Sequence, residues 1–185
     1  MTTNGRMEAG EALLRDRGAD NMEHPGGTLL AHLQRVSRLL AHWGADDDIQ
    51  LAGLCHAAYG TDGFDVALLS LHERALLAEA VGGTAEALVY LYASCNRQHT
   101  YPQLSQSIPT FTNRFDGTWH TPPHADIRAF VEITAANEWD VLRHNEQLAR
   151  RYGAELTQLL SDAGRYLSEA ARTAWTPPNS AGSAP

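Results

Sequence analysis

The sequence has few basic residues, with 14 Lys and Arg against 22 Asp and Glu among 185 residues, and its formal net charge is −8. Binding to phosphate backbones or to anionic lipid surfaces requires clustered Lys and Arg. The charge therefore argues against nucleic acid and against a membrane as partners. A small molecule is the expected ligand, and a homodimer is left open.

Cysteine is also scarce, because Cys55 and Cys95 are the only two and their spacing matches no motif. This excludes a zinc ribbon and a disulfide framework and fits a reducing compartment. The first 20 residues are polar and lack the continuous apolar segment of a secretion signal. We therefore predict a cytoplasmic protein.

No alternating apolar run typical of a strand stands out, so we expect little or no sheet and an all-α fold. Apolar residues instead recur at spacings of three and four in residues 29–43 and 127–141, and residues 49–59 are apolar on nearly every side. These three segments predict helices, and the third predicts a buried central one. Weaker patterns predict further helices at 8–17, 73–81, 84–93 and 154–174.

The chain length and an apolar content of 43% are sufficient for one domain, which we place at residues 8–175. Residues 1–7 and 176–185 are predicted to be disordered tails, and the second of these is rich in Pro, Ser, Gly and Ala. Residues 98–123 have weak periodicity and several aromatic and proline residues. They are either a binding loop or an ordered surface excursion without function.

Two histidines, His32 and His56, lie 24 positions apart on consecutive predicted helices, and each falls on the apolar stripe of its helix. A single inward histidine is usually a core residue whose nitrogens are both hydrogen-bonded. Two inward histidines that converge favour a shared functional site, because buried titratable groups are costly to retain. We expect their imidazoles to lie within about 10 Å of each other, as a shared hydrogen-bonded or metal-centred site requires.

The segment from His32 to Asp62 (HLQRVSRLLAHWGADDDIQLAGLCHAAYGTD) resembles the N-terminal half of HD-domain metal-dependent phosphohydrolases, most closely the hydrolase module of alarmone synthetase/hydrolases. The residues that carry the resemblance are His32, Val36, Gly44 and His56, and the later segment FVEITAANEWDV resembles the last metal-binding motif of that family. The resemblance implies an HD-domain-like helical bundle.

The departures from the HD pattern concern the metal ligands that the resemblance implies. Ala57 stands where the family has the Asp of its His-Asp doublet, Asn137 stands where it has its final Asp, and Gly60 and Thr61 replace an acidic pair. Carboxylate charge is what makes such a site hold a divalent cation tightly. The substitutions therefore predict a degenerate metal site and disfavour hydrolysis through a metal-bound hydroxide.

A closer resemblance is to a family of HD-like proteins without an assigned activity that carry a His-Ala/Ser-x-Tyr-Gly-Thr-x-Gly-Phe motif. Here residues 56–64 read HAAYGTDGF, and Cys95, Asn96 and Arg97 resemble a later motif of that family. This resemblance implies a common origin with that family but no particular reaction.

Further candidate residues surround the histidine pair in this interpretation. Glu138 is a carboxylate that could orient a histidine, and the hydroxyl of Tyr59 could donate to a substrate oxygen. Thr61 follows a glycine that permits a sharp turn presenting backbone N–H groups, and Arg97 could bind a carboxylate or phosphate. The alternatives without a catalytic role are a buried polar network for Glu138, an ordinary turn for Thr61 and a favourable charge at a helix end for Arg97. The candidate substrate-binding residues are Thr61, Asn96, Arg97, Thr134 and Asn137, and the other seven histidines are expected mostly at the surface.

Three functions remain open from the sequence. The leading hypothesis is a metal-independent small-molecule enzyme in which His56 and His32 perform acid/base chemistry, with Tyr59 and Glu138 assisting, and in which lyase, isomerase, cyclase and hydrolase reactions are not resolved. The second is a non-catalytic ligand-binding or regulatory protein. The third is an enzyme with a shifted mononuclear Fe, Mn or Zn site using His32, His56 and Glu138. No cofactor is favoured.

Overall fold

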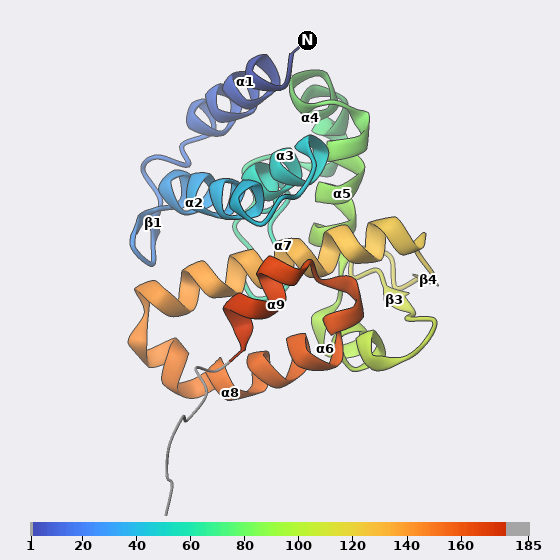
Figure 1. Ribbon diagram of the computed structural model, residues 1–185. Coiled ribbons are helices and arrows are strands. Elements are labelled where there is room, and N and C mark those ends of the chain that lie inside the picture. The colour runs from blue at the N-terminus through green and yellow to red at the C-terminus, as the bar shows by residue number, and fades with distance from the viewer. Residues whose placement is uncertain (1, 177–185) are drawn as a thin grey trace, which may run out of the picture.

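The computed structural model describes residues 2–176 and confirms the all-α fold class (Figure 1). The longer helices are α1 (Thr3–Asp16), α2 (Leu29–His42), α3 (Asp47–Cys55), α4 (Arg74–Val81), α5 (Gly83–Ser94), α7 (His124–His144) and α8 (Glu146–Asp162). Shorter ones are α6 (Arg97–Thr100), α9 (Glu169–Trp175) and the 3₁₀ helices η1 (Leu71–Glu73), η2 (Tyr101–Ser105) and η3 (Gly164–Tyr166). No helix within residues 2–176 has both the length and the apolar character needed to cross a membrane.

Strands are confined to two antiparallel hairpins. β1 (Glu23–His24) pairs with β2 (Gly27–Thr28), and β3 (Phe111–Thr112) pairs with β4 (Trp119–His120). The first hairpin turns through Pro25 and Gly26, the latter with φ +80°, a sequence and conformation typical of a type II turn. This turn brings His24 next to the first turn of α2.

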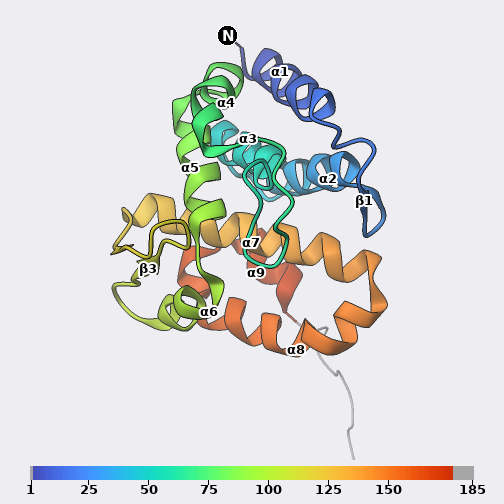
Figure 2. The ribbon, with the colours of Figure 1, turned by 180° about the vertical axis from the view of Figure 1, so that it is seen from behind.

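The core forms where α2, α3, α5 and α7 meet, and α7 lies between the α1–α5 layer and the α8–α9 layer (Figures 1 and 2). The close approach of α2 and α3 depends on Gly53, because a Cβ there would clash with Leu40. The side chains of Thr28 and Asp46 accept hydrogen bonds from backbone N–H groups in the first turns of α2 and α3. These caps set the starts of the two helices that carry His32 and His56.

The predicted N-terminal tail is wrong for residues 3–7, because α1 begins at Thr3 and not near residue 8. Thr2 caps the helix, Thr3 donates a hydrogen bond to Asp47, and Arg6 donates to Asp48 and to the carbonyl of Val81. These contacts join segments more than 40 residues apart, so the local composition of the tail does not reveal them. Of the predicted C-terminal tail, only Thr176 lies within the described residues.

The helix predicted at 154–174 is wrong in its boundaries. The structure has α8, which begins after Asn145, then η3, and then α9, which is capped by Ser168. Ala163 and Leu167 of the predicted stripe are buried, whereas Ala170 in α9 is exposed. Residues 98–123 are ordered as α6, η2 and the second hairpin, and Arg165 holds η2 by donating to the carbonyls of residues 104–106.

Candidate functional site

A pocket of about 960 Å³ opens between α7, α8, the first hairpin and the η2 segment, and it is lined by His32, His56 and Asn137. The ring centroids of His32 and His56 are 5.4 Å apart, which confirms the expected convergence of the pair. His32 comes from α2, His56 caps the C-terminus of α3, and Asn137 comes from α7. Three segments far apart in the sequence therefore meet at one site.

His56 is held in one tautomer. Its Nδ1 lies 2.8 Å from the carbonyl oxygen of Gly53, and a carbonyl can only accept, so Nδ1 carries the proton. Nε2 is then left with its lone pair, and it has no hydrogen-bond partner among the described residues. Burial, followed by the neighbouring His32, lowers the pKa of His56 to about 3, so the ring is neutral at physiological pH. His56 therefore presents an unprotonated nitrogen at the pocket.

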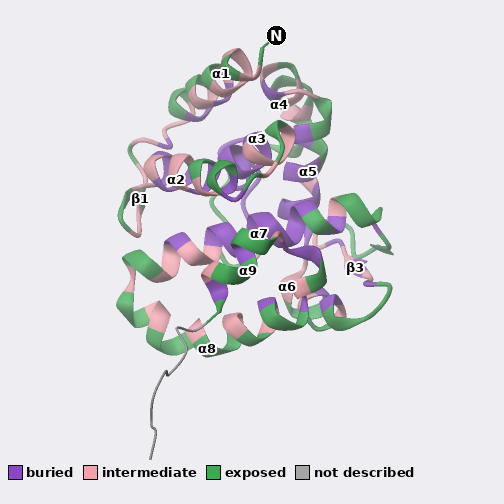
Figure 3. Cartoon of the chain, in the orientation of Figure 1, coloured by how far each residue is buried: buried purple, intermediate pink, exposed green. Residues whose placement is uncertain are grey.

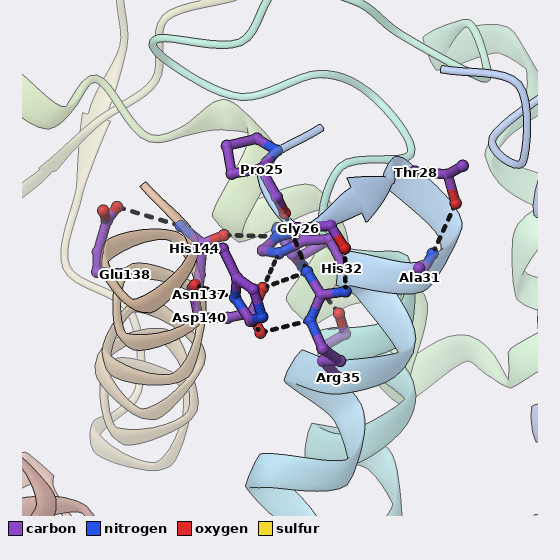
Figure 4. Close-up of polar contacts among 12 residues, drawn as sticks. Pro25, Gly26, Thr28, Ala31, His32, Arg35, Asn137, Glu138, Asp140 and His144 are labelled. Atoms are coloured by element: carbon purple, nitrogen blue, oxygen red, sulfur yellow. Dashed lines mark hydrogen bonds and ion pairs between the residues drawn. The ribbon is translucent and has the colours of Figure 1, made fainter. Parts of the chain in front are cut away.

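His32 is buried, with 1% exposure, and both of its nitrogens are engaged. Nδ1 donates to Asp140 at 2.7 Å, and Nε2 lies 3.0 Å from Oδ1 of Asn137 (Figure 4). Asp140 also accepts two hydrogen bonds from Arg35, at 2.7 and 2.9 Å. Although burial opposes it, the hydrogen bonds and charges of His32 and Arg35 lower the pKa of Asp140 to about 2, so its carboxylate is ionised.

The network continues through Asn137 to Glu138 and Arg97. The amide nitrogen of Asn137 donates to Glu138 at 3.1 Å, and Glu138 accepts a hydrogen bond from Arg97 at 3.2 Å. With this orientation, Oδ1 of Asn137 accepts from Nε2 of His32, and turning the amide over reverses the direction of that hydrogen bond. The contacts form one polar chain from Asp140 through His32, Asn137 and Glu138 to Arg97.

The first hairpin and the network are tied together by Arg35, which donates to the carbonyls of Pro25 and Gly26 as well as to Asp140 (Figure 4). The hairpin thereby places His24 against His32, with ring centroids 4.1 Å apart. Burial and the charge of His32 lower the pKa of His24 to about 4. Its Nδ1 is buried and lacks a partner within the described part of the chain.

Most of the predicted site residues meet at this pocket. His32, His56, Thr61, Arg97, Asn137 and Glu138 all line it. The η2 segment also contributes Tyr101, Pro102 and Ser105, which the binding-loop alternative for residues 98–123 predicts and the surface-excursion alternative does not. The buried hydroxyl of Tyr101 has no partner in the region that the structure describes.

Tyr59 was expected at the site, and this is wrong. The expectation extended α3 by one turn past His56, but the α-helix ends at Cys55, and the chain then turns. The hydroxyl of Tyr59 donates to Glu86 at 2.9 Å, and Glu86 also pairs with Arg74. Tyr59 therefore belongs to a separate polar cluster.

Three smaller expectations also need correction. Asn96 caps α6 by accepting from the N–H of His99, and Thr134 donates to the carbonyl of Phe130 within α7, so neither lines the pocket. Thr61 does line it, but its backbone N–H donates to the carbonyl of Phe64, so the turn presents no free N–H at that residue. Gly60 adopts φ +70°, which permits this tight bridge.

Sequence reasoning missed Asp140 and His24. Asp140 lies three residues after Asn137 and so on the same face of α7, a spacing that was visible in the sequence. His24 belongs to the seven histidines expected mostly at the surface, although the adjacent Pro25 and Gly26 predict a tight turn. That turn does not by itself reveal which helix the hairpin contacts.

A bound divalent metal finds a poor donor set in the present arrangement. Within residues 2–176, no group of three or more His, Cys, Asp or Glu side chains is placed to hold a metal ion. Nε2 of His32 faces Asn137, and Glu138 faces Arg97, so both would have to exchange partners before binding a cation. Among the site histidines that the structure describes, Nε2 of His56 and Nδ1 of His24 are the nitrogens without a hydrogen-bond partner.

We expect purified protein to carry less than one equivalent of tightly bound transition metal, because Ala57 and Asn137 are uncharged and His32 is already engaged. Inductively coupled plasma mass spectrometry on protein purified without chelators measures this directly. Stoichiometric Fe, Mn or Zn that survives dialysis and is lost in His56→Ala would contradict the prediction.

Acid should destabilise the fold through His56. Its pKa in the folded state is about 3 and lies below the unfolded value near 6.5, so the unfolded state binds more protons in between, and stability falls as the pH drops below about 6.5. At pH 5 this single group should cost about 2 kcal/mol relative to pH 7. Urea unfolding at both pH values should therefore show a loss about 2 kcal/mol smaller in His56→Gln than in wild type. Equal losses in the two proteins would refute the assignment.

Comparison with known proteins gives one match. A family model described as a domain of unknown function (DUF6817) matches residues 13–97, just under half of the chain. The matched region includes His32, His56 and Arg97 and ends before α7, which supplies Asn137, Glu138 and Asp140. Searches of curated proteins and of solved structures found no match.

Proposed function

We propose that this protein is a metal-independent enzyme that performs acid/base chemistry on a small molecule, with His56 as the group that exchanges a proton with the substrate. The observation that carries the proposal is the state of His56: Nδ1 is fixed by the carbonyl of Gly53, and the lone pair of Nε2 is free at a pocket large enough for a small molecule. The relationship of this chain to HD-domain proteins stays a separate prediction.

The low pKa of His56 in the empty site makes it a weak base, and the proposed chemistry accounts for this. A proton that moves from a substrate O–H, C–H or bound water to Nε2 leaves a negative charge on the substrate beside the new imidazolium. That pair of opposite charges favours the protonated ring at the moment of transfer. Arg97 lines the same pocket and pairs with Glu138 in the empty site, and it is the cation that such a transient anion would share.

His32 acts as a positioning residue in this proposal. Its hydrogen bonds to Asp140 and Asn137 hold the ring against His56. Glu138 lines the pocket beside them and accepts hydrogen bonds from Asn137 and Arg97, so it holds both side chains in place. His56 therefore both takes up the proton and returns it to the product.

One reaction class is excluded by composition. All 14 basic residues are arginine, and the chain has no lysine. A Schiff base between substrate and a lysine side chain is therefore not available as an intermediate. Lyase, isomerase, cyclase and hydrolase reactions that begin with proton transfer remain within the proposal.

The second candidate function is a non-catalytic ligand-binding protein. The weak basicity of His56 favours it, because a ring with a pKa of about 3 is primarily a hydrogen-bond acceptor. Both functions use the same pocket and the same nitrogen, and they differ only in whether turnover occurs.

The test is incubation of wild type and His56→Gln with a metabolite extract, followed by mass spectrometry of the small molecules. The enzyme proposal expects wild type to deplete a metabolite and generate a product, and His56→Gln to do so far more slowly. A compound that is retained by wild type without chemical change would support the binding protein instead.

A further inference from the structure

The pocket has two unlike halves. A group of buried and half-buried polar lining residues, here called the deep end, consists of His24, His56, Arg97, Tyr101 and Glu138. The end of α7 and one face of α8 form an apolar wall, with exposed Glu155, Gln158 and Asp162 beside it, and its apolar residues are Val141, Leu142, Leu148, Tyr152, Leu156 and Leu159. A ligand that fills this space must therefore combine a polar group with an apolar body.

Helix α8 is the least buried of the longer helices, and much of its apolar face borders the pocket. Among its 17 residues only Leu160 is buried, and Figure 3 shows the helix mostly in the colours of intermediate and exposed residues. Leu148, Leu156 and Leu159 stay only half-buried, and Tyr152 is 37% exposed, although all four line the pocket. Apolar surface left facing a cavity gains free energy when an apolar ligand covers it.

The charges around the pocket disfavour an anionic ligand. Exposed carboxylates of Glu23, Glu155 and Asp162 line it, and the charge of Arg97 is already matched by Glu138. Arg97 is the only Lys or Arg in the lining, so no unmatched side chain cation remains for a phosphate or carboxylate. A cationic group also finds no unpaired counter-charge at the deep end, because Arg97 and Glu138 neutralise each other there.

The unfilled hydrogen-bonding groups of the deep end match an uncharged partner. Nε2 of His56 needs a donor, while the buried hydroxyl of Tyr101 and Nδ1 of His24 lack partners among residues 2–176. Buried polar atoms of this kind normally have a hydrogen bond, which a ligand can supply. A hydroxyl group both donates and accepts, so it can serve His56 and Tyr101 together.

We propose that the site takes an uncharged amphipathic small molecule, whose apolar body lies against α8 and whose hydroxyl-type polar group meets His56 and Tyr101. The inference rests on the proposed function, because it names the substrate class of the same site. It also separates this pocket from the phosphate-ester chemistry that the HD resemblance implies.

The test is a calorimetric titration with four probes that share one eight-carbon chain: octan-1-ol, octanoate, octyl phosphate and octylammonium. We expect octan-1-ol to bind at least about tenfold more tightly than each charged probe. Glu138→Gln should raise the affinity for octanoate by about tenfold, because it leaves the charge of Arg97 unmatched.

Two variants test the position of the apolar body. Leu148→Asn and, independently, Tyr152→Ser should each weaken octan-1-ol binding by about fivefold or more, since both place a polar group on the apolar wall. Leu76→Asn is the matched control, because Leu76 is an exposed helical leucine in α4 that does not line the pocket, and its binding should equal wild type.

The outcomes distinguish this inference from the proposed function. Octanoate or octyl phosphate binding as tightly as octan-1-ol, no binding of octan-1-ol, or unchanged binding in both wall variants would each overturn the substrate class while leaving acid/base turnover intact. Octan-1-ol binding with the expected variant effects, but without turnover of any metabolite, would support the substrate class and overturn the enzyme.

Discussion

Replacing Asp140 with Asn should lower the free energy of unfolding by about 3 kcal/mol, because it removes one partner of a buried ionic network. Asp140 is 6% exposed and accepts hydrogen bonds from His32 and from both arms of the Arg35 guanidinium. Asn keeps the shape and one acceptor but loses the charge, so Arg35 is left without its counter-ion. The loss also loosens the first hairpin, which Arg35 holds.

Urea unfolding at pH 7 measures this effect, and Asp48→Asn is the matched control. Asp48 pairs with Arg6 at 2.6 Å, but its side chain is 34% exposed. Exposed pairs contribute about 1 kcal/mol or less, so the control should unfold nearly as wild type does. A similar loss in both variants would show that the Asp140 network contributes no more to the free energy of unfolding than an exposed ion pair does.

Replacing His56 with Gln should lower turnover by about a hundredfold to ten-thousandfold, which is the usual contribution of a general base. Gln can still donate to the carbonyl of Gly53 and has similar volume, but its amide has no basic nitrogen. The loss should appear mainly in kcat, because proton transfer is an interaction that the transition state makes and the ground state does not. Initial rates on the metabolite identified from the extract measure it.

Two further variants define the role of His56. His32→Gln should cost less turnover, because it removes positioning and leaves Nε2 of His56 in place. Tyr59→Phe should leave turnover at the wild-type level, since the Tyr59 hydroxyl contacts Glu86 and lies outside the pocket lining. Full activity in His56→Gln at wild-type thermal stability would leave the histidine pair as core packing.

The site was predictable where the reasoning depended on helix periodicity. Periodicity placed His32 and Asn137 on inward faces, and the same rule applied to α7 would have found Asp140. It failed at Tyr59, because a periodic pattern does not mark where a helix ends, and α3 ends one residue before His56. It failed at His24 because a two-residue strand leaves no periodic pattern.

An all-α fold with two inward histidines follows from the order of the residues alone, because apolar spacing along a helix is a local property. The chemical state of those histidines does not, since each state depends on a particular partner atom. Asp140 lies 108 residues from His32, and Asn137 lies 105 from it, so only the packing of α2 against α7 engages both nitrogens of that ring. The free nitrogen of His56 and the half-buried face of α8 in the same pocket likewise exist only once the helices have packed together.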